Sequence, residues 1–218
     1  MQIEKKSVII SIQSTEGDPT HNKTCKRAFM ESAIKGGAQG FRLAGVEDVK
    51  LAKKLYPNIP VIAITKPKHI PENYKELVYI TPTVDDAIKL IEAGADVIAF
   101  DGTKRHDYSK IVETIKNHNK IAMADISTYE EGIMAHKLGC DLVSTTLSGY
   151  TTYSKQSDDP DFELVNKLSK EGIKVIAEGK IWEKNQVKTA FENGAYAVVI
   201  GSAVTRPWLI VERFLKYE

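Results

Sequence analysis

The chain has 218 residues, a length typical of one domain, and we expect residues 1–218 to form a single unit. Its 30 basic and 29 acidic side chains give a net charge of +1, which argues against nucleic acid or an acidic membrane surface as a partner. Hydrophobic residues at 42% and charged residues at 27% are typical of a globular protein, and no apolar run reaches membrane-spanning length.

The first residues lack the layout of a secretion signal, so we expect a cytoplasmic protein. Cys25 and Cys140 are far apart and show no Cys-x-x-Cys spacing, which favours free thiols in a reducing compartment. The five histidines lie in different segments, and no dinucleotide-binding fingerprint or P-loop is present. We therefore expect neither a metal ion nor a cofactor.

One unit recurs along the chain: an amphipathic helix ends near a glycine, and a short apolar run rich in β-branched residues follows. Such a run is typical of a parallel strand that is buried on both faces. The strands predicted in this way, in chain order, are residues 7–12, 41–43, 61–65, 97–100, 120–124, 142–146, 174–177 and 196–200.

Helical segments follow each predicted strand. Two of them begin with a hydroxyl residue before acidic ones, at Thr83 and at Ser127-Thr128, as expected for capped helix starts. Strict alternation of strand and helix predicts parallel pairing with right-handed crossovers, hence the α/β class and a (β/α)8 TIM barrel. Residues 79–81 resemble a ninth strand, either an extension before the next helix or a sign that the count is wrong. An open doubly wound sheet is the rival, and it lacks its glycine fingerprint after the first strand.

Polar residues at the ends of the predicted strands should face the active site of such a barrel, because this end of the strands carries it. Polar side chains collected at one end of a core are costly unless they have a function. In chain order they are Gln13, Arg42, Lys66, Asp101, Asp125, Thr145, Thr146, Glu178, Gly201 and Ser202.

Small residues follow the seventh and eighth strands, at Gly179-Lys180 and Gly201-Ser202, each before a helix. Backbone N–H groups of such loops and the helix dipole favour a phosphate dianion. Arg206 could add a charge-assisted contact. The alternative is that these glycines only close tight turns, but two such loops in the expected units favour a phosphate-binding barrel of the ribulose-phosphate-binding type.

Lys66 and Glu178 are the candidate catalytic residues. Lys66 directly follows an apolar strand, and burial near Arg42 would lower its pKa and make it usable as a base or a Schiff-base amine. Its alternative role is pairing with a phosphate or carboxylate. Glu178 ends the seventh strand, almost opposite the third on an eight-stranded ring, and it could instead form a salt bridge across the mouth. Asp125 and Asp101 could orient hydroxyl groups or pair with lysines, and Asp101 could cap a helix.

Three aromatic-rich features remain open. Trp182 and Trp208 follow the proposed phosphate loops and either wall the pocket or pack in the core. The last predicted helix, residues 208–217, carries more apolar residues than one narrow stripe needs. This excess is compatible with a homodimer interface and also with packing on the chain's own barrel.

Seven sequence pieces together resemble the N-acetylmannosamine-6-phosphate 2-epimerases of bacterial sialic acid catabolism. They are Ile10-Ser11-Ile12-Gln13, Gly40-Phe41-Arg42, Ile80-Thr81-Pro82-Thr83, Ala122-Met123-Ala124-Asp125-Ile126-Ser127-Thr128, Thr145-Thr146-Leu147-Ser148-Gly149-Tyr150-Thr151, Ile176-Ala177-Glu178-Gly179 and Gly201-Ser202-Ala203-Val204-Thr205-Arg206-Pro207. The resemblance implies the barrel fold, a homodimer and an isomerase without a redox cofactor that acts on a small amino sugar phosphate.

The resemblance also assigns roles by motif. It implies Lys66 and Glu178 as the catalytic pair. The substrate-binding residues implied are Gln13, Arg42, Asp125 and Thr146, and the phosphate-binding residues are Gly179, Lys180, Gly201, Ser202 and Arg206. Departures from the family pattern, such as Pro67 after the lysine and Lys180 in place of an arginine, lie beside the core motifs.

Epimerisation at C2 suits these residues, because the C2 proton of an open-chain sugar is acidified by the C1 aldehyde. Lys66 would remove the proton and Glu178 would supply one on the other face, or Lys66 would form an iminium with C1. Another phosphate-binding isomerase, aldolase or synthase is the alternative among enzymes. A non-catalytic sugar-phosphate sensor is disfavoured, since both candidate catalytic side chains are present.

Overall fold

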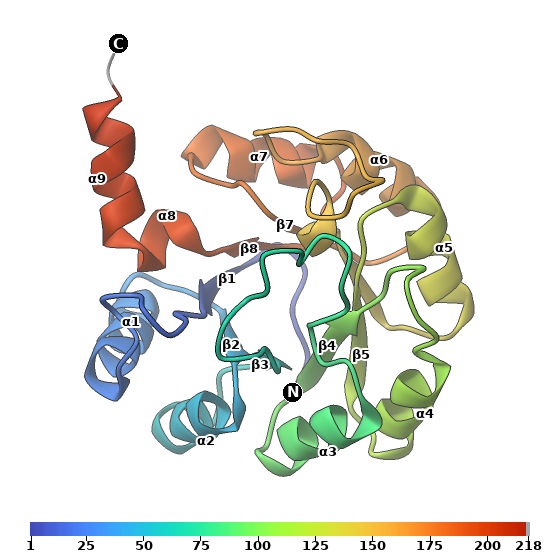
Figure 1. Ribbon diagram of the computed structural model, residues 1–218, viewed down its shortest axis with the longest axis horizontal. Helices are drawn as coiled ribbons and strands as arrows, with labels where there is room; N and C mark the ends of the chain where they lie inside the picture. Colours follow the sequence, from blue (N-terminus) through green and yellow to red (C-terminus); the bar gives the residue numbers. More distant parts are fainter. Residues whose placement is uncertain (217–218) are drawn as a thin grey trace.

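A computed structural model describes residues 1–216, and its eight strands form a closed parallel barrel (Figure 1). Each strand pairs with the next one in sequence, and the last returns to the first, where Ala197 lies opposite Ser7. The strands are β1 (Ser7–Ile12), β2 (Gly40–Ala44), β3 (Val61–Ile64), β4 (Val97–Asp101), β5 (Ile121–Asp125), β6 (Leu142–Ser144), β7 (Val175–Glu178) and β8 (Ala197–Ile200). The predicted (β/α)8 barrel is confirmed.

Helices surround this barrel as an outer ring, from which the last of them extends away (Figure 1). They are α1 (Lys23–Lys35), α2 (Val46–Leu55), α3 (Val84–Glu92), α4 (Ser109–Asn117), α5 (Tyr129–Lys137), α6 (Phe162–Lys170), α7 (Lys184–Glu192), α8 (Ser202–Thr205) and α9 (Pro207–Leu215). Both predicted caps are present: the Thr83 side chain accepts from the N–H of Asp86, and Thr128 forms a capping box with Glu131. Gly139 follows α5 with a φ of 91°, the left-handed conformation that ends a helix.

Two apolar layers hold the barrel together. Inside it, side chains such as Ile9, Ile62 and Met123 are fully buried and fill the interior. Outside it, alternate strand residues such as Phe41 and Phe100 pack against the helices. Each of these large side chains stabilises the fold by about 2–3 kcal/mol through burial. Since the interior is filled, a ligand can enter only at an end of the strands.

Residues 79–81 form an extension of the barrel rather than a ninth strand. The carbonyl of Ile80 accepts from the N–H of Asp101 at 3.0 Å, and Thr81 exchanges two hydrogen bonds with the backbone of Thr65 at 3.0 and 3.2 Å. The segment therefore lies between the ends of β3 and β4 and satisfies backbone groups that neither strand pairs there.

The sixth strand ends earlier than predicted. Residues 145–146 were expected in the strand, but Thr145–Leu147 form a turn of 3-10 helix, labelled η1. The hydroxyl of Thr145 accepts from the N–H of Glu178 at 3.1 Å and donates to its carbonyl at 3.0 Å. Because this side chain takes over the pairing with the end of β7, the backbone of β6 is free to turn.

The C-terminal helix is the element that departs most from a regular barrel. It was expected over residues 208–217; α9 covers Pro207–Leu215, and residue 217 lies outside the described residues. None of its residues is buried, and it extends away from the ring of helices (Figure 1). Trp208, Leu209 and Ile210 are half-buried, whereas Val211, Phe214 and Leu215 are exposed, so α9 packs on its own barrel only through its first turn. In the described part of the chain no helix is long and apolar enough to cross a membrane.

Candidate active site

A cavity of about 440 Å³ opens at the C-terminal ends of the strands. Most of the side chains predicted from the sequence line it, and they come from β7, η1, α8 and the loops after β1, β3, β7, β8 and α8. These residues are Gln13, Lys66, Thr146, Glu178, Gly179, Lys180, Gly201, Ser202 and Arg206. Arg42 and Asp125 were predicted with them but are fully buried and do not line the cavity.

Lys66 enters the cavity directly after β3, and its ammonium donates to Gln13 Oε1 at 2.7 Å. The amide nitrogen of Gln13 donates in turn to Ser11 Oγ at 2.8 Å, which fixes the orientation of the amide. Burial, together with the nearby charge of Arg42, lowers the pKa of Lys66 to about 8. A substantial fraction of this amine is therefore neutral near physiological pH and able to accept a proton.

Glu178 ends β7 and reaches the cavity from the other side of the ring. Its Oε2 accepts from Arg42 Nη1 at 2.6 Å and lies 3.1 Å from Thr146 Oγ1, while 12% of the side chain stays exposed. Burial raises the pKa of Glu178, although the charge of Arg42 opposes the rise. The expected cross-mouth salt bridge exists, but its cation is Arg42 rather than Lys66.

Arg42 and Asp125 form a buried ion pair behind Glu178. The two guanidinium nitrogens bind the two carboxylate oxygens at 3.0 and 2.5 Å, a bidentate arrangement. Burial lowers the pKa of Arg42, but Asp125 and Glu178 more than offset this and hold it above its ordinary value. Thr146 Oγ1 lies 2.8 Å from Asp125 Oδ1 and so joins the two carboxylates. The cluster holds Glu178 in one position with its second oxygen free.

The two candidate catalytic residues lie on opposite walls, since β3 and β7 are four strands apart in a ring of eight. One is an amine whose burial favours the neutral form, and the other is a carboxyl whose burial favours the protonated form. Such a pair can remove a proton from one face of a carbon and deliver one to the opposite face.

One end of the cavity has the features of an anion site. Gly179 has a φ of 109°, a backbone conformation that residues with a side chain rarely adopt. Gly201 directly precedes α8. The first N–H groups of a helix have no partner within the helix and point to its N-terminal side, where Ser202 lines the cavity. Arg206 also lines the cavity; its side chain is 36% exposed and forms an ion pair with Asp18 at 3.8 Å.

The ammonium of Lys180 is directed away from this end. It donates to the carbonyl of Ser157 and lies 5.1 Å from the ring centre of Tyr150. Its backbone has a φ of 60°, uncommon for a residue with a side chain. Lys180 thus lines the cavity while its side chain ties the loop after η1 to the loop after β7.

Several lining residues escaped the sequence analysis, among them Tyr79, Tyr150 and Leu209. Both tyrosines could have been found from the sequence. Tyr150 belongs to one of the motifs that carry the family resemblance, and Tyr79 begins the strand-like segment at residues 79–81. Trp182 walls the cavity as one interpretation held, whereas Trp208 does not.

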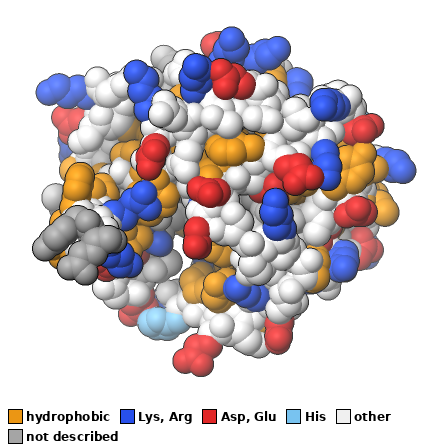
Figure 2. Space-filling view, turned by 90° about the horizontal axis from the view of Figure 1, so that it is seen from above, with side chains coloured by type: hydrophobic (Ala, Val, Ile, Leu, Met, Phe, Trp, Pro, Cys, Tyr) orange, Lys and Arg blue, Asp and Glu red, His pale blue; other side chains and the backbone are white. Residues whose placement is uncertain are grey.

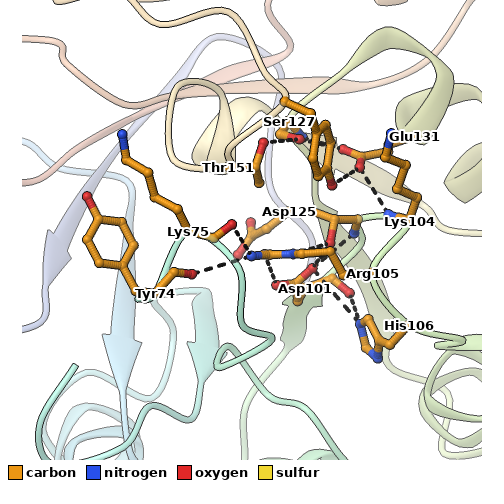
Figure 3. A network of polar contacts seen from close by, with 12 residues as sticks. Tyr74, Lys75, Asp101, Lys104, Arg105, His106, Asp125, Ser127, Glu131 and Thr151 are labelled. Atoms are coloured by element: carbon orange, nitrogen blue, oxygen red, sulfur yellow. Dashed lines mark hydrogen bonds and ion pairs between the residues drawn. The ribbon is translucent and has the colours of Figure 1, made fainter. Parts of the chain in front are cut away.

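Asp101 belongs to a second polar network rather than to the cavity (Figure 3). It is fully buried and pairs with Arg105 at 2.5 Å, so it neither pairs with a lysine nor caps a helix. Glu131 organises the rest of the network: it accepts from the N–H of Lys104 and the hydroxyls of Ser127 and Tyr153. Three loops at the mouth are joined in this way. Among residues 1–216 no cluster of three His, Cys, Asp or Glu side chains is arranged to hold a metal ion.

The chain matches the protein-family profile described as "Putative N-acetylmannosamine-6-phosphate epimerase" over residues 27–217. Two curated relatives named "Putative N-acetylmannosamine-6-phosphate 2-epimerase" come from Caldanaerobacter subterraneus subsp. tengcongensis and Clostridioides difficile. The first is 45% identical over 96% of this chain and 90% of its own length. The second is 42% identical over 97% of this chain and 96% of its own length.

A solved structure has a closely similar fold. It was determined in a structural and biochemical characterisation of the N-acetylmannosamine-6-phosphate 2-epimerase from Clostridium perfringens, and it aligns with a TM-score of 0.91 at 40% identity. The alignment covers 98% of this chain and 94% of that chain, so the likeness involves the whole fold rather than one motif.

Proposed function

Because the chain belongs to the N-acetylmannosamine-6-phosphate epimerase family, we propose that it interconverts N-acetylmannosamine 6-phosphate and N-acetylglucosamine 6-phosphate by inverting C2. It is then an isomerase of amino sugar catabolism that acts on a small sugar phosphate. The observation that carries the proposal is the pair Lys66 and Glu178 on opposite walls of one cavity, with an anion site at its end.

The proposed reaction begins with the open-chain sugar, in which C2 lies next to the C1 aldehyde. The neutral amine of Lys66 takes the C2 proton, and the electron pair of the C–H bond forms an enolate. The protonated carboxyl of Glu178 then gives its proton to C2 from the opposite face. The centre is inverted, and exchange with solvent returns a proton to Glu178 and removes one from Lys66. The reverse direction exchanges the two roles.

The neighbouring residues support this exchange of protons. The Gln13 carbonyl oxygen holds the Lys66 ammonium at 2.7 Å, and Arg42 holds one Glu178 oxygen, which leaves the other for the substrate. The buried positive charge of Arg42 also favours the enolate. Gly179, Gly201, Ser202 and Arg206 form the proposed phosphate site, where binding of the remote phosphate helps to hold C2 between the two walls.

The test is proton NMR of the purified protein with N-acetylmannosamine 6-phosphate in deuterated water. We expect N-acetylglucosamine 6-phosphate with deuterium at C2, and much slower turnover of unphosphorylated N-acetylmannosamine. Cleavage products would indicate an aldolase, and borohydride inactivation that requires substrate would indicate an iminium on Lys66. A folded protein that converts neither epimer would overturn the proposal.

We further propose that the protein is a cytoplasmic homodimer that binds neither nucleic acid nor membrane. Basic and acidic side chains are interspersed on the face drawn in Figure 2, so this face offers no positive stripe for a polyanion. The dimer is supported by α9, whose Val211, Phe214 and Leu215 are 55%, 77% and 69% exposed. Hydrophobic side chains of this kind are unfavourable in water unless a partner covers them.

A matching surface exists on the barrel. Two adjoining hollows of about 670 and 510 Å³ lie along the outer side of β1, one against α7 and one against α1, and Val8 lines both. Phe29 and Phe191 are on their walls. In a regular (β/α)8 barrel the eighth helix covers this position, but here α8 reaches it only with Val204. The proposed dimer places α9 of each copy in this groove of the other.

Phe214→Glu should convert the dimer into a monomer, because it places a charge in the proposed interface. Light scattering coupled to size-exclusion chromatography measures the mass directly. Leu138→Glu is the matched control, an exposed leucine at the end of α5, and it should leave the dimer unchanged. A wild-type protein that is monomeric at tens of micromolar, or a Phe214 variant that stays dimeric, would contradict this interface.

A further inference from the structure

The loop between β3 and α3, residues 65–83, contains neither helix nor strand and is unusually long for a barrel connection. It begins with Thr65 and Lys66, and Tyr79 and Ile80 near its end line the cavity. A loop of this length loses much conformational entropy when it is ordered, so contacts elsewhere must hold it.

Arg105, in the loop after β4, provides such contacts to the middle of this segment. Its Nη1 donates to the backbone carbonyls of Tyr74 and Lys75 at 3.4 and 3.1 Å. Figure 3 shows the guanidinium between these carbonyls and Asp101. The contacts involve backbone oxygens, so they depend on the position of the loop and not on the side chains it carries there.

The other side of the guanidinium is anchored to the barrel. Nη2 binds Asp101 Oδ2 at 2.5 Å, and Nε donates to Thr103 Oγ1 at 2.9 Å. Asp101 is fully buried at the end of β4, and it also accepts from the N–H and the hydroxyl of Thr103. Only 9% of the Arg105 side chain is exposed. A planar fork of five N–H donors can serve all these acceptors together, whereas a lysine ammonium cannot.

The contacts continue from Arg105 to the cavity wall. The ring of Tyr74 packs edge-on against the ring of Tyr79, with 6.4 Å between their centres. Burial raises the pKa of Tyr79 to about 12, with Asp101 adding to the rise, so its hydroxyl stays protonated. Tyr79 thus stands between the Asp101–Arg105 pair and the cavity that Lys66 enters.

We propose that Arg105 is a positioning residue of the epimerase: it holds residues 65–83 closed against the barrel, so that Tyr79 walls the cavity and keeps water from Lys66. The inference rests on the proposed function for its effect on turnover, but not for its effect on the loop. Arg105 itself does not line the cavity, so it acts only through the segment that it holds.

The state of Lys66 provides a readout of this role. The charged groups that influence it are Arg42 on β2, Glu178 on β7, Asp125 on β5 and Arg206 before α9, and Gln13 after β1 is its neutral partner. None of these contacts Arg105. A change in the pKa of Lys66 on replacing Arg105 would therefore report access of water rather than a lost charge contact.

The variant is Arg105→Lys, which keeps a positive charge next to Asp101 but cannot form all the hydrogen bonds of the guanidinium at once. Arg27→Lys on the exposed face of α1 is the matched control. Hydrogen–deuterium exchange should be about tenfold faster in peptides from residues 66–80 of the Arg105 variant, with the barrel strands unchanged. The midpoint of the rising limb of kcat/KM, set by the Lys66 pKa of about 8 in the wild type, should rise by about one unit, with about tenfold lower kcat/KM at pH 7. Arg105→Gln should show the same shifts.

Unchanged exchange in residues 66–80 would overturn the inference whatever the enzyme does. Faster exchange with an unchanged pH profile would also overturn it, since the arginine would then order the loop without affecting Lys66. Circular dichroism establishes that each variant is folded. If the wild type converts no sugar phosphate, the proposed function fails, and the exchange measurement still decides whether Arg105 holds the loop.

Discussion

Replacing Lys66 by alanine should lower kcat/KM for epimerisation by about 10³-fold or more, because the proposed mechanism uses this residue as the base in one direction and as the acid in the other. The barrel should stay folded, since the lysine makes one side-chain hydrogen bond and its burial opposes its own charge. Glu178→Gln should lose a similar factor. It keeps the shape of the side chain and removes the titrating proton.

The same roles predict how kcat/KM depends on pH. Lys66 must be neutral to accept the proton, so kcat/KM should rise with pH up to the lysine pKa of about 8. Glu178 must be protonated, so its deprotonation adds a falling limb to the profile, which the burial of this carboxyl moves to higher pH. Deuterium incorporation at C2, followed by NMR, is the direct measurement. Lys68→Ala, an exposed lysine two residues further on, is the control and should retain full activity. An active Lys66→Ala would refute the assignment.

Replacing Arg42 by methionine should lower the free energy of unfolding by about 3–5 kcal/mol, because it leaves Asp125 and Glu178 buried without their counter-ion. Arg42 is itself fully buried and bridges both carboxylates. Catalysis should suffer as well, since the variant no longer holds Glu178 towards the substrate. Urea denaturation at pH 7 measures the loss of stability.

The loss should shrink as the pH falls. Burial raises the pKa of Glu178 and Arg42 opposes the rise, so without Arg42 the folded-state pKa of this carboxyl lies further above its unfolded value. The folded state is then penalised only where Glu178 of the unfolded chain is ionised, and near pH 4 the protonated Glu178 carboxyl can be buried without a cation. The double variant Arg42→Met, Asp125→Asn should recover part of the stability at pH 7. If Arg42→Met is as stable as the wild type, the pair does not act as a structural support.

The strands were predictable because a barrel strand that is buried on both faces has a simple sequence pattern, an unbroken apolar run after a glycine. All eight were found, with ends within a few residues of those observed. The end of β6 was misplaced because the turn depends on the hydroxyl of Thr145 bonding the backbone of Glu178, a partner 33 residues away. A residue-by-residue pattern does not contain such a contact.

In the candidate site, too, some features could be predicted from the sequence and others could not. The sequence placed Arg42, Asp125 and Glu178 at one end of the barrel, because strand direction alone determines that. It did not indicate that the first two form an ion pair behind the third, since this depends on how far each side chain reaches across the closed ring. Tyr79 and Arg105 were missed for a related reason: their roles depend on the path of a long loop, which no periodic pattern specifies.

Closure of the ring has a consequence for the order in which the protein becomes active during its synthesis. The first strand keeps one edge unpaired until Ala197 and the residues after it meet Ser7 and its neighbours, so nearly the whole chain must leave the ribosome beforehand. Contacts between residues this distant in sequence form late in folding. Until they form, the unpaired hydrogen-bonding edge of the first strand is exposed and can pair with other chains. The nascent chain therefore becomes active only when β8 completes the barrel. A chain truncated before β8 should aggregate rather than retain reduced catalytic activity.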